Sequence, residues 1–364
     1  MNRTDITVTK TSLPPLDEYV TYLEAIWARG WVTNHGPLVG ELEERLRTAL
    51  ASEYVLFVAN GTLALQIAIR ALGLRGEVIT TPFSYVATTS SLIWENCTPV
   101  MADIDQDTLT IDPDRIEAAV TDRTTGILAT HVYGIPCDVE RIGQIAARHG
   151  LKVIYDAAHA FGSQYDGRSV FSYGDVSTAS FHATKVFHTV EGGAVCSNSP
   201  EVARKAALLR NFGHTGPNAF ALPGINGKNS ELHAAMGLCN LGSVETHLQL
   251  RRAIVARYDR NLAGLPLRRP SIPDHMTWNF AYYPLVFASE AALCRVVTLL
   301  NEQGVYPRRY FYPSLATLSF VERRWATPIA DDVAPRVLCL PLYTALVSDQ
   351  VDRICGLVGR GLQV

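Results

Sequence analysis

The sequence predicts an α/β fold with a large, doubly wound, mainly parallel-sheet domain (residues 1–249) and a smaller α+β C-terminal domain (residues 250–364). Between about residues 40 and 200, short β-branched apolar runs alternate with longer segments of helical periodicity. This alternation is typical of helices that cover both faces of a parallel sheet. After residue 250 strands and helices no longer alternate regularly, and a chain of 364 residues has room for both cores.

The expected elements of the large domain follow in chain order. Strands are expected at 54–60, 76–82, 98–104, 124–134 and 151–160, and short strand-like segments near 180–185 and 191–198. Helices are expected at 61–74, 85–96, 113–120, 138–150, 199–213 and 230–265. The Gly-, Pro- and Asn-rich segment 213–229 is expected to be a long loop, and long loops in compact domains are usually functional. In the small domain, strands are expected at 279–287 and 336–341, and helices at 290–304 and 348–358.

Composition excludes several classes of protein. The formal net charge is −3, from 32 basic and 35 acidic residues without long runs, so neither nucleic acid nor an anionic membrane is an expected partner. No apolar run approaches the roughly 20 residues of a membrane span, and the N-terminus lacks the pattern of a signal peptide. The seven cysteines are scattered without a CxxC pair. A cytoplasmic protein with reduced thiols, no metal and a small polar substrate is expected.

Two strand ends carry candidate ligand-binding residues. Asn60-Gly61-Thr62 joins an expected strand to a long helix, where free N–H groups favour a phosphate. An ordinary helix cap explains the same turn equally well. Asp156 ends the apolar run "VIYD" and is followed by two alanines, which leave room for a flat ring whose cationic nitrogen the carboxylate could hold. Helix capping is again the alternative.

Lys185 lies in the segment "SFHATKVFHTVEGGA" without charged neighbours in sequence before Glu191. A poorly solvated amine loses part of its preference for the charged form and becomes available as a nucleophile that forms Schiff bases. A structural lysine that extends its amine to water is the competing interpretation. Tyr85, just after the second strand, offers a ring that could stack on a cofactor or fill the core. A phosphate cradle, a stacking ring, a carboxylate and a sheltered lysine, in this order, match the needs of pyridoxal phosphate (PLP).

Ordered motifs from about Gly36 to the C-terminus make the resemblance specific. The chain resembles the sugar aminotransferases of the DegT/DnrJ/EryC1/StrS family, which are fold-type I PLP-dependent transferases with an aspartate aminotransferase-like fold. The motifs that carry the resemblance are "NGTLALQIA", "GEVITTPFSYVAT", "ADIDQDTLTIDP", "HVYGIPCDV", "VIYDAAHAFG", "SFHATKVFHTVEGGA", "RNFG", "GINGKNSELHAAMGL" and "RRYFYPSL".

The resemblance implies a role for each matching residue. Lys185 would bind PLP covalently and Asp156 would pair with the pyridinium nitrogen. His159 would lie near the 3-hydroxyl, and Tyr85 would stack on the ring. The phosphate would be held by Gly61, Thr62 and Ser180, and by Asn226 from the neighbouring subunit of a homodimer with shared active sites.

The segments around Lys185 and "GINGK" resemble the members that aminate C4 of a nucleotide-linked 4-keto-6-deoxyhexose, typically dTDP-4-dehydro-6-deoxyglucose, with glutamate as donor. The product would be a 4-amino-4,6-dideoxyhexose for O-antigen or another glycan. Candidates for contacts with the nucleotide sugar are His188, Lys228, Arg308, Arg309 and Tyr310, although solvated or structural roles are open for each.

Three other functions remain as alternatives. One is amination at C3 by the same family, and another is a PLP-binding regulator without turnover. A nucleotide-sugar oxidoreductase would also suit the α/β pattern, but no GxGxxG fingerprint follows the first strand.

Overall fold

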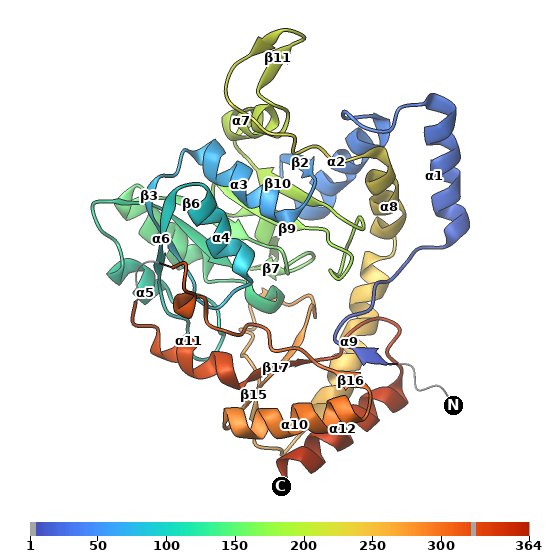
Figure 1. The fold of residues 1–364 in the computed structure, drawn as a ribbon, viewed down its shortest axis with the longest axis vertical. Coiled ribbons are helices and arrows are strands. Elements are labelled where there is room, and N and C mark those ends of the chain that lie inside the picture. Colours follow the sequence, from blue (N-terminus) through green and yellow to red (C-terminus); the bar gives the residue numbers. More distant parts are fainter. Residues whose placement is uncertain (1–4, 322–324, 364) are drawn as a thin grey trace.

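The computed structural model describes residues 5–321 and 325–363. A large α/β body forms the upper part of Figure 1, and a smaller body, built mainly from C-terminal residues, lies below it. The α/β fold class predicted from the sequence is confirmed.

A seven-stranded sheet in the order β2-β10-β9-β6-β5-β3-β4 forms the centre of the large body. Its strands are β2 (Tyr54–Val58), β3 (Gly76–Thr80), β4 (Cys97–Met101), β5 (Thr124–Thr130), β6 (Lys152–Asp156), β9 (Val176–Ser180) and β10 (Gly193–Ser197). β10 is antiparallel to both of its neighbours, and the other pairs are parallel. All strands except β10 therefore run in one direction, and their carboxyl ends meet at one edge of the sheet.

Helices cover both faces of this sheet. They are α2 (Pro37–Leu50), α3 (Gly61–Leu72), α4 (Val86–Trp94), α5 (Pro113–Ala118), α6 (Val139–His149), α7 (Pro200–Arg210) and α8 (Glu231–Leu241). Successive side chains of β6 alternate between the two faces. Ile154 joins the core beneath α3 and α7, whereas Val153 and Tyr155 join the core beneath α6. A strand buried on both faces explains the continuous apolar run before Asp156.

The small body contains a three-stranded antiparallel sheet packed against helices. Its elements are β13 (Leu267–Arg268), β15 (Tyr283–Phe287), β17 (Val337–Leu340), α9 (Val244–Asn261), α10 (Glu290–Glu302), α11 (Pro328–Val333) and α12 (Ser348–Leu362). The N-terminal strand β1 (Ile6–Thr7) pairs with β16 (Val305–Tyr306) of this body, and α1 (Leu16–Arg29) packs against α8 (Figure 1). The expected domain boundary after residue 249 falls inside α9.

The described residues also contain five further short strands: β7 (Gln164–Tyr165), β8 (Arg168–Ser169), β11 (His214–Gly216), β12 (Ala219–Phe220) and β14 (Met276–Thr277). Within residues 5–321 and 325–363, no helix is both long and apolar enough to cross a bilayer.

Some local expectations were wrong. The segment expected to be strand-like near 180–185 belongs to a strand only at Ser180, where β9 ends. The segment 230–265 forms two helices rather than one, because α8 ends at Leu241, Gly242 follows it, and α9 begins at Val244. Glycine is a poor helix former, and the break lets α8 stay buried in the large body while α9 leads into the small one. The segment 213–229 is not entirely irregular, since β11 and β12 form a small hairpin at the top of Figure 1.

Candidate active site

The candidate residues converge because four strands end at the same edge of the sheet. Gly61 follows β2, Tyr85 follows β3, Asp156 ends β6 and Ser180 ends β9. Ligands of open α/β sheets bind at this carboxyl edge. These residues, together with Lys185, line one cavity of about 300 Å³.

Asp156 lies at the bottom of the cavity with its carboxylate almost completely buried. Its Oδ2 accepts a hydrogen bond from the Thr88 hydroxyl at 2.7 Å, and its Oδ1 accepts one from the Ala158 backbone N–H at 3.1 Å. Burial raises the pKa of this carboxyl, whereas Thr88, Ala158 and the charge of Lys185 lower it in part. The cavity therefore contains a carboxylate whose hydrogen bonds favour the ionised form.

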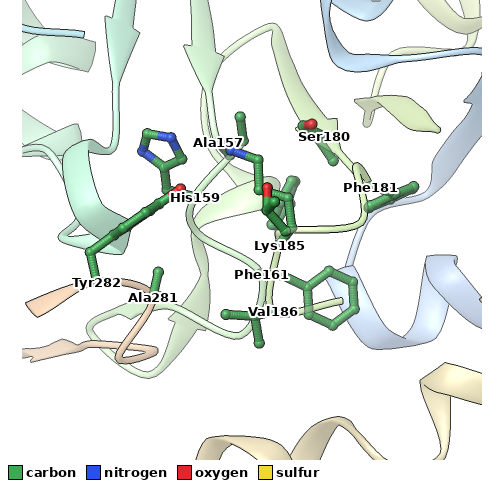
Figure 2. Close-up of a pocket in the computed structure, with 13 residues that line it drawn as sticks. Ala157, His159, Phe161, Ser180, Phe181, Lys185, Val186, Ala281 and Tyr282 are labelled. Carbon is green, nitrogen blue, oxygen red and sulfur yellow. The ribbon is translucent and has the colours of Figure 1, made fainter. Parts of the chain in front are cut away.

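Lys185 belongs to the loop between β9 and β10, and its backbone N–H donates to the His182 carbonyl at 2.9 Å. Figure 2 shows its side chain rising between His159 and Ser180 toward Ala157. Burial lowers the pKa of the amine from 10.5 to about 8, although the nearby Asp156 and Tyr85 oppose this shift. The amine is thus partly unprotonated near neutral pH, as a nucleophile or general base requires.

The turn after β2 forms a tight backbone cradle. Asn60 caps α3 by accepting a hydrogen bond from the Leu63 N–H at 2.9 Å, and the N–H groups of Gly61 and Thr62 come before the first helical hydrogen bonds. A methyl group on Gly61 would lie 2.9 Å from the Ser180 Cβ, so glycine is needed for this close approach. Two N–H groups at a helix N-terminus beside a serine hydroxyl suit a phosphate.

Aromatic side chains from the small body close one wall of the cavity. His159 stacks on Phe311 with ring centroids 5.5 Å apart, and the edge of Tyr282 meets His159 at 5.1 Å (Figure 2 shows Tyr282 and His159 together). Burial and the charge of Lys185 keep the pKa of His159 well below its usual value. Its Nδ1 is buried and has no hydrogen-bond partner among the described residues, and the neutral imidazole lines the cavity.

Comparisons with known proteins agree with this geometry. Residues 16–359 match the DegT/DnrJ/EryC1/StrS aminotransferase family. The chain belongs to this family.

Individual relatives cover almost the whole of this aminotransferase. It is 43% identical to the dTDP-4-amino-4,6-dideoxy-D-glucose transaminase of Shigella dysenteriae over 357 residues, which are 96% of this chain and 97% of that one. Among solved structures, DesI in the presence of its TDP-sugar product superposes with a TM-score of 0.94 at 34% identity, covering 99% of this chain and 94% of that one. The sugar aminotransferase Spr1654 of Streptococcus pneumoniae in its PMP form has a TM-score of 0.90 at 26% identity, covering 97% and 99%.

PLP is the cofactor of this aminotransferase family, and the cavity fits it. The buried carboxylate of Asp156 suits a cationic ring nitrogen, and the amine of Lys185 suits an aldehyde. The unused Nδ1 of His159 suits a ring hydroxyl, and the cradle at Gly61 and Ser180 suits a phosphate. Each group of the cofactor would thus meet a side chain or backbone group of complementary chemistry.

The residues expected to contact the nucleotide sugar fall into two groups. Arg308 and Tyr310 line the cavity, with the guanidinium of Arg308 5.0 Å from the centre of the Tyr310 ring. His188 and Arg309 are not among the residues that line it. His188 is buried beneath the N-terminal segment, where its Nε2 lies 2.7 Å from the Ser12 carbonyl oxygen. Arg309 points away and donates to Glu290 at 2.6 Å.

The long-loop residues Asn226 and Lys228 also lie outside the cavity of their own chain. Lys228 donates hydrogen bonds to the side-chain oxygens of Asn226 at 2.8 Å and Asn211 at 2.9 Å. Asn226 also forms a backbone bridge with Asn211, which ties the loop to the end of α7. Neither side chain therefore lines the cavity that contains Lys185 in the same chain.

Sequence reasoning missed Thr88, which contacts Asp156, and Tyr282 in the aromatic wall. Thr88 could have been suspected, because it lies three residues after Tyr85 at the start of a helix that begins at the same sheet edge. Tyr282 carries no comparable local signal, because it comes from the distant small body.

Proposed function

We propose that this aminotransferase moves an amino group from L-glutamate to the C4 keto carbon of a nucleotide-linked 4-keto-6-deoxyhexose, with dTDP-4-dehydro-6-deoxyglucose as acceptor. The product would be a 4-amino-4,6-dideoxyhexose for O-antigen or another glycan. The observation that supports the amino-transfer chemistry is that Lys185 and Asp156 line the same cavity. The choice of C4 and of the nucleotide is supported by the 43% identity to the Shigella transaminase over nearly the full chain.

Bound PLP supplies a protonated ring that accepts the electron pair released when a C–H bond next to the nitrogen breaks. Asp156 holds the positive charge on the ring nitrogen. Lys185, with a pKa of about 8, is matched to taking a proton from carbon and returning it near neutral pH. The wall formed by His159, Tyr282 and Phe311 covers one side of the cavity with aromatic rings.

Arg308 is the proposed contact for the diphosphate of the acceptor. Its side chain lines the cavity beside Tyr310, and it comes from the small body, whereas Gly61 on the same cavity comes from the large one. A guanidinium pairs well with phosphate oxygens, and the Tyr310 ring beside it offers apolar surface to a sugar or base.

We further propose a homodimer in which Asn226 of one subunit reaches the cofactor phosphate of the other. Support comes from the loop itself, because Asn226 is held away from its own cavity. Large apolar side chains near this loop are also exposed, among them Trp94 at 77% and Phe220 at 63%. Mixing two inactive variants, Lys185→Ala and Asn226→Ala, tests this arrangement. Shared sites predict partial recovery of activity in hybrid dimers, whereas separate sites predict none.

A cytoplasmic location is proposed as well, supported by seven cysteines that are all free in the structure.

Two assays test the proposed function. Borohydride treatment of the holoprotein followed by peptide mass spectrometry should place the pyridoxyl adduct on Lys185. A panel of nucleotide-linked 3-keto and 4-keto sugars with glutamate, analysed by NMR, should give an amine at C4, and Lys185→Ala should give no product. An amine at C3 would contradict the choice of carbon. Lack of turnover with every acceptor, despite a correctly placed adduct, would favour a regulatory protein.

A further inference from the structure

A chain of buried hydroxyl groups lies behind Asp156, outside the reacting part of the cavity. The Thr88 hydroxyl is 2.7 Å from Asp156 Oδ2, the Ser84 hydroxyl is 2.8 Å from that of Thr88, and the Thr130 hydroxyl is 3.1 Å from that of Ser84. The three hydroxyl residues are each at most 2% exposed. They come from the end of β5, the turn after β3 and the first turn of α4. Three separate segments are therefore connected through side chains that end on one carboxylate.

The ionised carboxylate determines the direction of every hydrogen bond in this chain. An ionised carboxylate only accepts, so Thr88 must donate its proton to Asp156. The single hydroxyl proton of Thr88 is then used, so the Thr88 oxygen can only accept a hydrogen bond from Ser84. Ser84 therefore donates to Thr88 and accepts from Thr130. If Oδ2 carried a proton and donated it to Thr88, every bond in the row would reverse and the Thr130 proton would point away from Ser84. The arrangement thus favours the ionised carboxylate through hydrogen bonds that polarise one another.

Within the described part of the chain, no charged group near Asp156 stabilises its ionised form at every pH in the way that the Thr88 hydrogen bond does. Lys185 lowers the pKa of Asp156, but because its own pKa is about 8, this contribution is lost as the pH rises through that value. Three further titratable groups lie near Asp156, namely the imidazoles of His131 and His159 and the thiol of Cys137. Burial lowers the pKa values of the two imidazoles and raises the pKa of the thiol, so all three are uncharged near neutral pH. Among the described side chains, the Thr88 hydroxyl is thus a source of support for the carboxylate that does not depend on pH.

We propose that Thr88, backed by Ser84 and Thr130, is a positioning residue that keeps Asp156 ionised, so that the proton between Asp156 and the cofactor ring stays on the ring nitrogen. The part of this inference that concerns the proton on the cofactor ring rests on the proposed function. Without the Thr88 hydrogen bond, Asp156 binds a proton more tightly and competes with the ring nitrogen for it. The electron-accepting capacity of the ring then falls, although Asp156 itself is unchanged.

The test compares three variants on the same helix. Thr88→Val keeps the shape and removes the hydroxyl, whereas Thr88→Ser keeps the hydroxyl. Thr89→Val is the matched control, because Thr89 is completely buried and its hydroxyl oxygen has no partner among the described residues. Thr130→Val removes the hydroxyl at the far end of the chain, which bonds Ser84 rather than the Asp156 carboxylate, although the backbones of Thr130 and Asp156 are paired in β5 and β6. It serves as a second probe should Thr88→Val fold poorly.

The first measurement is the titration of Asp156 in the full-length apoprotein, by NMR of isotope-labelled aspartate carboxyl carbons assigned with Asp156→Asn. Thr88→Val should raise the midpoint by about one to two pH units, the range for a hydrogen bond to a charged group. Thr130→Val should raise it by less, and Thr88→Ser and Thr89→Val should leave it near the wild-type value. An unchanged midpoint in Thr88→Val, or an equal shift in Thr89→Val, would overturn the proposal.

The second measurement is the NMR signal of PLP labelled at its ring nitrogen, in the holoprotein. Thr88→Val should move this signal toward that of the unprotonated nitrogen, and Thr88→Ser should restore it. A raised Asp156 midpoint with an unmoved ring signal would overturn the link to the cofactor. The apoprotein titration involves neither PLP nor a sugar. Its result therefore stays valid even if the proposed function is wrong, and the two failures can be told apart.

Discussion

Replacing Asp156 with asparagine should lower the pKa of Lys185 below its value of about 8. Burial has already lowered this pKa from 10.5, and the Asp156 carboxylate opposes the shift by stabilising the ammonium form. Asparagine keeps the size of the side chain and removes the charge. The amine of Asp156→Asn should therefore be more reactive than that of the wild type at neutral pH, even though amino transfer is lost.

The expected magnitudes follow from the pKa values. At pH 7 a lysine with the ordinary pKa of about 10.4 is unprotonated in roughly 0.04% of molecules, and one with a pKa of about 8 in roughly 9%. The cavity thus increases the free amine of Lys185 by roughly 200-fold. Removing the Asp156 charge can add at most about tenfold more, because the unprotonated fraction cannot exceed one.

Competitive acylation measures this directly. The apoprotein is treated with a small anhydride between about pH 6 and about pH 10, and the Lys185 peptide is quantified by mass spectrometry against the same peptide from denatured chain. Asp122→Asn, which removes an exposed carboxylate, controls for the change in net charge. The reasoning is refuted if native Lys185 titrates like the denatured peptide, or if Asp156→Asn moves its midpoint upward.

Three further predictions concern the cradle, the acceptor site and the helix packing. Gly61→Ala should weaken PLP binding in equilibrium titrations of the apoprotein, because the added methyl lies 2.9 Å from the Ser180 Cβ, and it should cost about 1–3 kcal/mol of stability. Arg308→Ala should raise KM for the nucleotide sugar about tenfold or more in steady-state kinetics, while Arg309→Ala should not, because only the former side chain lines the cavity. Glu231→Gln should lower the free energy of unfolding by about 1.5–3 kcal/mol in denaturant titrations, since this buried carboxylate accepts two backbone N–H groups at the start of α2. An unfolding midpoint equal to that of the wild type would contradict this role.

Local sequence was enough to predict the fold class and several of the residues that the fold brings together in one cavity. Asp156 and Gly61 could be assigned to strand ends because the apolar run or turn that places each one is contiguous with it. Lys185 could be recognised because its uncharged neighbours in sequence are also its shelter in the fold. Parallel strands bring their carboxyl ends to one edge, so a correct order of strands already implied a common site.

The tertiary structure decided whatever depends on residues far apart in the chain. Thr88 meets Asp156 across 68 positions, and the wall formed by Tyr282 and Phe311 closes the cavity from the small body. The same long-range packing buries His188 under the N-terminal segment, although it lies three residues from Lys185. Periodicity reports which face of its own helix or strand a residue occupies, but not which distant segment covers that face. Several residues that line the cavity could therefore be named from the sequence, whereas its supporting contacts and its aromatic wall were defined only by folding.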